Sequence, residues 1–136
     1  ENTKSGSIKN VRFFNVTTKG ENGVLIHGNE DNIIEDITFE NCRVELTKTS
    51  KWQCGLYDLR PCLDYGVESF DNSAFFIRWA KNVTIEKTKT RWGRLCDSYK
   101  HAIDAANVEN LSLIRFDGHA VDPSVDDFKF ENVKEN

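Results

Sequence analysis

The 136-residue sequence contains no methionine, only two prolines and only eight glycines. Collagen-like and linker-like chains are rich in proline and glycine, so both classes are excluded. No apolar run approaches the roughly 18 to 20 residues that a membrane-spanning helix requires, so no membrane partner is expected. Basic residues are outnumbered 18 to 22 by acidic ones, with a net charge of -4, and this balance disfavours nucleic acid as a partner because its binders usually carry a basic excess.

Hydrophobic residues make up 38% and charged residues 29% of the chain, a composition typical of a folded domain. The length corresponds to one domain, so residues 1–136 are expected to form a single domain. The sequence begins at Glu1, without an initiator methionine or an apolar leader segment. We therefore expect either a mature chain or an excised part of a longer protein, and favour the second.

Cysteine is sparse for a disulfide scaffold of this length, with four residues at Cys42, Cys54, Cys62 and Cys96. Cys54 and Cys62 bracket a loop-like stretch and are the candidate disulfide pair. The cysteine spacings do not match a zinc site, and no metal is expected. Three Asn-x-Ser/Thr motifs satisfy the glycosylation rule, which favours an exported protein, extracellular or periplasmic.

An internal repeat is the most informative feature of the sequence. Five segments superimpose without gaps, and each begins with Asn or Asp followed by an apolar, a polar and a second apolar residue. They are Asn10–Val16, Asp36–Cys42, Asn82–Thr88, Asn110–Phe116 and Asp127–Val133. The period-two alternation predicts a strand with one buried face. The leading Asn or Asp is expected in a tight left-handed turn, a conformation that both residues tolerate.

Short strands that recur every 20 to 30 residues or so indicate a solenoid. We therefore predict an all-β fold, a right-handed parallel β-helix of about five rungs. Neither end leaves room for a capping helix, so the end rungs are expected to meet either the remaining rungs of a parent chain or a second copy. The interior is expected to contain Phe13, Phe39, Phe128 and Phe130.

Two loops interrupt the repeat. An insertion occupies about residues 47–72, and a second loop spans Arg91–Lys100. Both leave the strand column on the same side, so we expect them to share one face. A long connection in a compact domain is often functional.

Five further segments are distinctive: Gly55–Cys62, Ala74–Ile85, Arg91–Gly93, Ser98–Ile103 and Phe116–Ala120. Over about residues 8–123 the sequence resembles the later rungs of pectinase-like β-helix proteins, grouped with glycoside hydrolase family 28, the polygalacturonases. The resemblance implies a parent protein that hydrolyses glycosidic bonds in an acidic, pectin-like polysaccharide. It implies no cofactor; calcium held by loop carboxylates stays open, because no ligand spacing identifies it.

The catalytic segments of that family are Asn-Thr-Asp, Asp-Asp, Gly-His-Gly and Arg-Ile-Lys, and the chain does not contain this set. Asp126-Asp127 is a paired Asp, but it lies near the end of the sequence and far from any Gly-His-Gly. Ile26-His27-Gly28 keeps only His-Gly. No catalytic role is carried over to these residues, so enzymatic activity stays open and the catalytic rungs are expected elsewhere in the parent protein.

Glycoside hydrolysis needs two carboxyl groups, roughly 5 to 10 Å apart, one of them protonated. Candidates in the loops are Asp58, Asp64 and Asp97. The simpler interpretation is a surface salt bridge or turn cap at Asp58, since such pairs are common. His101 and His119 each precede a short strand-like piece, and we expect them to stack on adjacent rungs rather than form a site.

The aromatic and arginine residues of the loops suit an acidic sugar, because aromatic rings offer flat faces to sugar rings and guanidinium groups bind carboxylates through paired hydrogen bonds. The candidate binding residues are Trp52, Tyr57, Arg60, Trp92 and Arg94. Alternatively, the aromatic residues pack the insertion onto the coil, and the chain is a non-catalytic glycan-binding or structural module. Arg78 and Trp79 are neighbours on a strand, so they are expected to face opposite sides.

Overall fold

The computed structural model describes residues 6–59 and 66–136. These residues form an all-β structure without a helix, as the repeat predicted, and hence contain no helix able to cross a membrane. The strands are β1 (Lys9–Phe14), β2 (Thr17–Gly20), β3 (Val24–His27), β4 (Ile34–Glu40), β5 (Arg43–Leu46), β6 (Leu56–Asp58), β7 (Val67–Ser69), β8 (Phe75–Glu86), β9 (Lys89–Trp92), β10 (Ile103–Ile114) and β11 (Phe128–Glu135).

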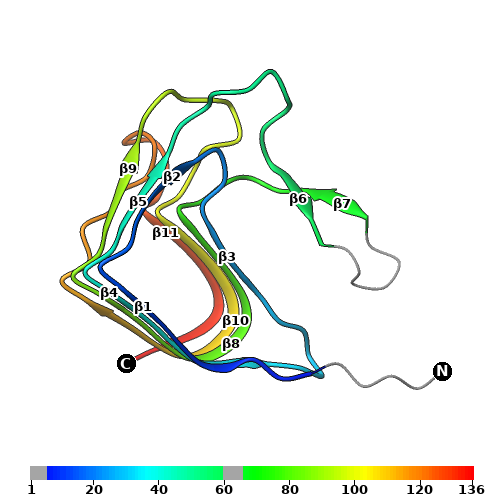
Figure 1. Cartoon of the computed structure of the whole chain (residues 1–136), viewed down its shortest axis with the longest axis vertical. Coiled ribbons are helices and arrows are strands. Elements are labelled where there is room, and N and C mark those ends of the chain that lie inside the picture. Colours follow the sequence, from blue (N-terminus) through cyan, green and yellow to red (C-terminus); the bar gives the residue numbers. More distant parts are fainter. Residues whose placement is uncertain (1–5, 60–65) are drawn as a thin grey trace.

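Most strands pair in parallel with strands from distant parts of the sequence (Figure 1). One sheet has the order β1-β4-β8-β10-β11, with β3 paired to the first part of β8, and a second has the order β2-β5-β9. Parallel strands need a crossover connection. After β1, β4 and β8 the crossover passes through a strand of the second sheet, whereas β10 is joined to β11 by residues 115–127 without a named strand; each time the chain returns to the first sheet. We call one such circuit a pass.

The strand register matches the repeat in its first four copies. Val11 pairs with Ile37 and Phe13 with Phe39, and the two later copies continue these columns with Val83 and Ile85, then Leu111 and Leu113. The leading residues adopt the expected left-handed backbone, with φ of 58°, 58°, 55° and 60° at Asn10, Asp36, Asn82 and Asn110.

The fifth copy pairs differently from the expected register. Phe128 lies beside Ile103 and Val133 beside Val108, so β11 begins next to the first half of β10. The left-handed position of this segment is accordingly Asn132, with φ of 52°, rather than Asp127. Both halves of β10 carry a period-two apolar pattern, and such a pattern defines which side chains face inward without defining which strand is the partner.

Left-handed residues form three columns along the stacked strands, and we call each column a corner. Besides the leading column, one column contains Asn15, Asn41, Lys87 and Arg115, and another contains Trp79, Asn107 and Asn132. Asparagine amides connect successive passes at these corners, at 2.8 to 2.9 Å, in the pairs Asn41→Asn15, Asn82→Asp36, Asn110→Asn82 and Asn132→Asn107. The amides thereby satisfy polar groups at the positions where the sheet hydrogen bonding is interrupted.

The third corner breaks the alternation expected for Arg78 and Trp79. Ile77 and Ala80 are 0% and 2% exposed and face the core, so both residues between them lie on the outside. The expectation of opposite faces is therefore wrong, and the physical reason is the φ of 54° at Trp79, which turns the chain between the two residues.

The core lies between the sheets and is built mainly of aliphatic and aromatic side chains. Phe39 is 4% exposed, stacked on Phe13 at 4.7 Å and packed edge-on against Phe75 at 5.1 Å. Phe13 and Phe128 are each 38% exposed, and Phe130 is half-buried. The prediction of an interior position is thus confirmed for Phe39 and only partial for the others, because β1 and β11 are the outermost strands of their sheet.

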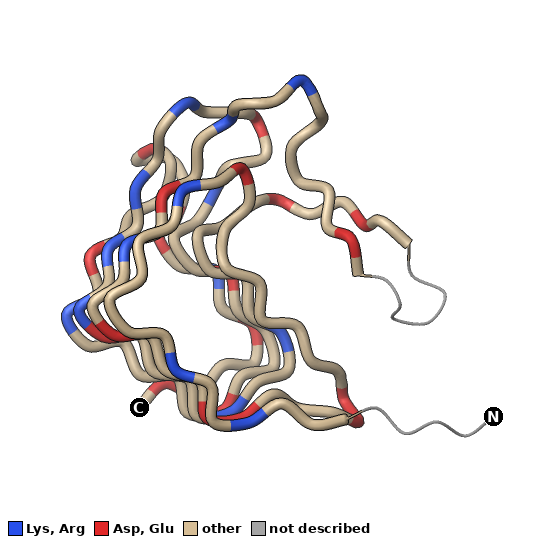
Figure 2. The backbone as a smooth tube through the Cα atoms, viewed as in Figure 1, with Lys and Arg blue, Asp and Glu red and all other residues tan. Residues whose placement is uncertain are grey.

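Charged residues follow one another along the outer surface of the stacked strands (Figure 2). The register aligns basic and acidic residues alternately in the row Lys9, Glu35, Lys81, Glu109 and Lys134. The first two of these form an ion pair of 3.2 Å. Alternation of sign avoids the repulsion that like charges would create at directly opposed positions.

Candidate functional site

The two loops predicted to share a face are covalently joined. Cys54 of the insertion forms a disulfide with Cys96 of the second loop, 42 positions away in the sequence. Cys54 is therefore not bonded to its candidate partner Cys62, which itself lies outside the described residues. Both loops follow strands that pair in register, β5 and β9, and this pairing brings Cys54 and Cys96 together.

A buried polar network fastens the base of the insertion. The Nδ2 of Asn72, a residue with 0% exposure, donates to Asn22 at 2.8 Å and to the Tyr57 hydroxyl at 2.9 Å. The Ser98 hydroxyl donates to Oδ1 of Asn72 at 2.6 Å. Tyr57 is 4% exposed, and burial raises the pKa of its hydroxyl. This candidate binding residue thus presents no open ring face to solvent.

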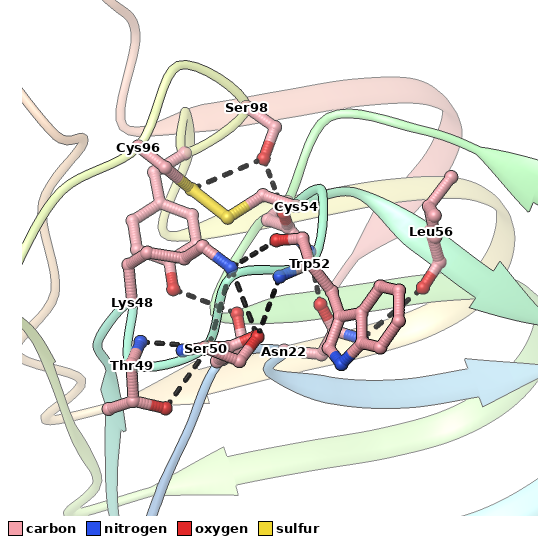
Figure 3. A network of polar contacts seen from close by, with 12 residues as sticks. Asn22, Lys48, Thr49, Ser50, Trp52, Cys54, Leu56, Cys96 and Ser98 are labelled. Carbon is pink, nitrogen blue, oxygen red and sulfur yellow. Dashed lines mark hydrogen bonds and ion pairs between the residues drawn. A yellow bond between two sulfur atoms is a disulfide. The ribbon is translucent and has the colours of Figure 1, made fainter.

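Glu21 holds the first turn of the insertion. Its carboxylate accepts hydrogen bonds from the backbone N–H and hydroxyl groups of Thr49 and Ser50 and pairs with the Lys48 ammonium at 3.4 Å. Figure 3 labels Lys48, Thr49 and Ser50 in this region. The N–H donors of Ser50 and Thr49 lower the pKa of Glu21 to about 2. The Tyr99 hydroxyl donates to the Glu21 carbonyl at 2.9 Å. Glu21 and Tyr99 therefore hold the turn that precedes Trp52 in place.

Trp52 and Arg94 are the candidate binding residues that project from the joined loops. Trp52 is 70% exposed, with the Lys51 ammonium 5.1 Å from its ring centre. Arg94 is also exposed, and its backbone is tied to the insertion by a bond from its N–H to the Thr47 hydroxyl at 2.9 Å. An open indole and two cations thus occur on one rigid pair of loops.

The other candidates are placed differently. Trp92 is half-buried, 5.3 Å from the Tyr99 ring, and its indole N–H donates to the His119 carbonyl at 2.9 Å. Asp58 is exposed on β6, which forms an antiparallel hairpin with β7 inside the insertion, and Asp97 is exposed in the second loop. Two further candidates, Arg60 and Asp64, lie outside the described residues.

A cluster of titratable groups not expected from the sequence surrounds His119. Its Nδ1 lies 3.3 Å from Asp127 and its Nε2 lies 3.9 Å from Asp117, while Arg91 pairs with Asp117 at 2.8 Å. The hydrogen bond from Arg91 lowers the pKa of Asp117, and the N–H of Ala120 lowers the pKa of Asp127. Both carboxyl groups are therefore ionised at neutral pH.

One residue of the paired Asp126-Asp127 belongs to this cluster. Asp127 lies eight residues after His119, and the intervening turn returns its carboxylate to the imidazole. His101 donates from its Nδ1–H to the Asp126 carbonyl, at 2.7 Å. The sequence signal for this contact was the short separation of His119 and Asp127, eight residues, with a proline-containing turn between them.

We also searched the described residues for a set of metal ligands. Within residues 6–59 and 66–136, no group of three or more His, Cys, Asp or Glu side chains is placed to hold a metal ion.

No family model, curated protein or solved structure matches the chain. The resemblance to the polygalacturonase family accordingly rests on the sequence segments given above.

Proposed function

We propose that the chain is a section of a right-handed parallel β-helix that binds an acidic, pectin-like polysaccharide. Support for the β-helix comes from two parallel sheets that the chain visits alternately and from the three corner columns of left-handed residues. Support for the right-handed sense is general, since crossovers between parallel strands of one sheet are right-handed in about 98% of cases.

The observation that carries the binding proposal is the exposure of Trp52. The Trp52 side chain is 70% exposed, although its loop is held by the disulfide and by the carboxylate of Glu21. Its apolar surface is therefore left in water and adds little to the stability of the fold. Its flat face suits a sugar ring, and the amphipathic indole is typical of wet interfaces. Lys51 and Arg94 supply the positive charge that a polyuronate requires.

An exported location fits the same loops. A stable disulfide between Cys54 and Cys96 requires an oxidising compartment, and cytosolic thiols are normally kept reduced. We therefore propose that the protein functions outside the cytoplasm, in an extracellular or periplasmic location.

The test is retention on immobilised polygalacturonate. Trp52→Ala and Arg94→Ala should each reduce retention about tenfold, whereas Phe14→Ser, which alters an exposed aromatic residue of β1, should leave it unchanged. Retention should fall with added salt, because exposed charge pairs are screened. Equal retention of Trp52→Ala and the unaltered chain would refute the role of this loop, and absence of retention by the unaltered chain would refute polysaccharide binding.

Hydrolysis of the glycosidic bond in the parent protein is a second candidate, favoured by the His119 cluster. Two carboxylates flank one imidazole, and a hydrolase needs a proton donor together with a carboxylate. The lowered pKa values keep Asp117 and Asp127 ionised, so these two groups could supply the carboxylate but not the proton. Release of reducing ends from polygalacturonate that disappears in His119→Gln and persists in Asp58→Asn would support this activity. Release abolished by Asp58→Asn alone would place it in the insertion instead.

A further inference from the structure

Trp79 occupies a corner position that favours asparagine. The equivalent residues in the next two passes are Asn107 and Asn132, and all three have left-handed backbones, with φ of 54°, 56° and 52°. Asparagine tolerates this conformation, whereas a bulky side chain in it is an outlier. The Asn132 amide also donates to Asn107 at 2.8 Å, a bond that tryptophan cannot continue. The fold alone therefore gives no reason for tryptophan here, and residues held in disfavoured backbone regions concentrate at functional sites.

Trp79 is one of the residues that line a depression of about 180 Å³ at this corner of the main sheet. Its other lining residues are the apolar Ile33, Ala80 and Val108, the two corner asparagines, and the charged Lys81, Glu109 and Lys134. The indole is half-buried, and its N–H donates no hydrogen bond to any residue in the described ranges. A site of this size is below the usual range for drug-sized ligands, so it suits one ring of a ligand.

Two lysines border the depression without an ionic partner. Lys81 and Lys134 belong to the alternating row of charges, with Glu109 between them in register. Lys9 in the same row pairs with Glu35 at 3.2 Å. By contrast, neither Lys81 nor Lys134 forms an ion pair among the described residues, and their ammonium groups are available to an anion.

We propose that this depression binds one carboxylate-bearing sugar ring. The Trp79 indole stacks on the ring, Lys81 and Lys134 neutralise the carboxylate, and the side-chain amides of Asn107 and Asn132 bond to hydroxyl groups. The inference rests on the proposed function for its ligand class only. The site is separate from Trp52 and Arg94, so the chain has a second point of contact along an acidic polysaccharide.

The decisive variant is Trp79→Asn, titrated with digalacturonate by isothermal calorimetry. Asparagine restores the residue of the neighbouring passes, so we expect the affinity to fall at least tenfold while the thermal midpoint stays the same or rises. The neutral methyl ester of the same disaccharide should bind several-fold more weakly than the acid. Lys81→Gln combined with Lys134→Gln should also lower the affinity about tenfold, and Lys9→Gln should not change it.

The outcomes separate this inference from the proposed function. Wild-type affinity of Trp79→Asn for digalacturonate overturns the site, and so does wild-type affinity of the double lysine variant, which alters only surface charge. If Trp52→Ala reduces retention on polygalacturonate and Trp79→Asn does not alter digalacturonate binding, the loops bind and the depression does not. If the unaltered chain binds neither probe, both proposals are refuted.

Discussion

Arg78 and Asp104 form an ion pair across neighbouring strands, with 3.0 Å between Nη2 and Oδ1. The Asp104 side chain is only 7% exposed and that of Arg78 is 20% exposed. The same guanidinium lies 3.9 Å from the centre of the Phe76 ring. Phe76 in turn packs against Tyr57 and Phe70 of the insertion, at 5.5 and 5.2 Å. The pair thus connects β8 and β10 directly beneath the hairpin.

Removal of one partner should be costly. Arg78→Leu leaves the Asp104 carboxylate buried without its ionic partner, and breaking such a pair costs about 3 to 5 kcal/mol. Urea denaturation would measure this loss in the free energy of unfolding. The double variant Arg78→Leu, Asp104→Leu should recover most of the stability, because no unpaired charge remains. A single variant as stable as the unaltered chain would contradict this account.

Phe39 and Phe13 offer a matched comparison. Phe39→Ala empties a site that is 4% exposed, and we expect a loss of about 3 to 5 kcal/mol. Phe13→Ala removes the same atoms from a residue that is 38% exposed, so about 1 to 2 kcal/mol is expected from the smaller apolar area. Phe39→Asp should prevent folding altogether, because it buries an unpaired charge. A thermal midpoint of Phe39→Asp equal to that of the unaltered chain would overturn the strand register.

The pairing of Cys54 with Cys96 can be tested with Cys62, the other cysteine of the insertion. Cys62→Ser should retain the Cys54–Cys96 bond, which peptide mapping under non-reducing conditions would detect. Replacement of both Cys54 and Cys96 by serine should lower stability by about 2 to 4 kcal/mol, as expected for the loss of a long cross-link. A Cys54–Cys62 peptide from the unaltered chain would show that the assigned pairing is incorrect.

Glu21 should make stability depend on pH in acid. Its pKa falls from 4.5 in the unfolded chain to about 2 in the folded chain, so the folded state favours the ionised carboxylate. The contribution is complete above pH 4.5 and is lost as the pH falls towards 2. Thermal midpoints measured from pH 6 downwards should therefore converge for the unaltered chain and Glu21→Gln. A difference that stays constant over this range would exclude titration of Glu21 as its origin.

Local patterns in the sequence were sufficient for the strands and for one kind of turn. Alternation of apolar residues identified the strand at Phe39 and its partners, since a side chain on a strand faces either the core or the solvent. The leading Asn10, Asp36, Asn82 and Asn110 were recognisable because asparagine and aspartate are favoured where φ is positive. These properties depend on a few adjacent residues, and so they can be inferred without the fold.

Contacts between passes were decided only by the tertiary structure. The partner of β11, the bond from Cys54 to Cys96 and the approach of Asp127 to His119 all depend on which segments become neighbours. The row of charges along the sheet and the depression at Trp79 depend on the same register. The sequence by itself determined which residues of the regular strand segments face inward, through their period of two, but not at Trp79, where a positive φ breaks the alternation. Packing of the passes against one another determined which residues meet, because a period-two pattern is satisfied equally well by several partners.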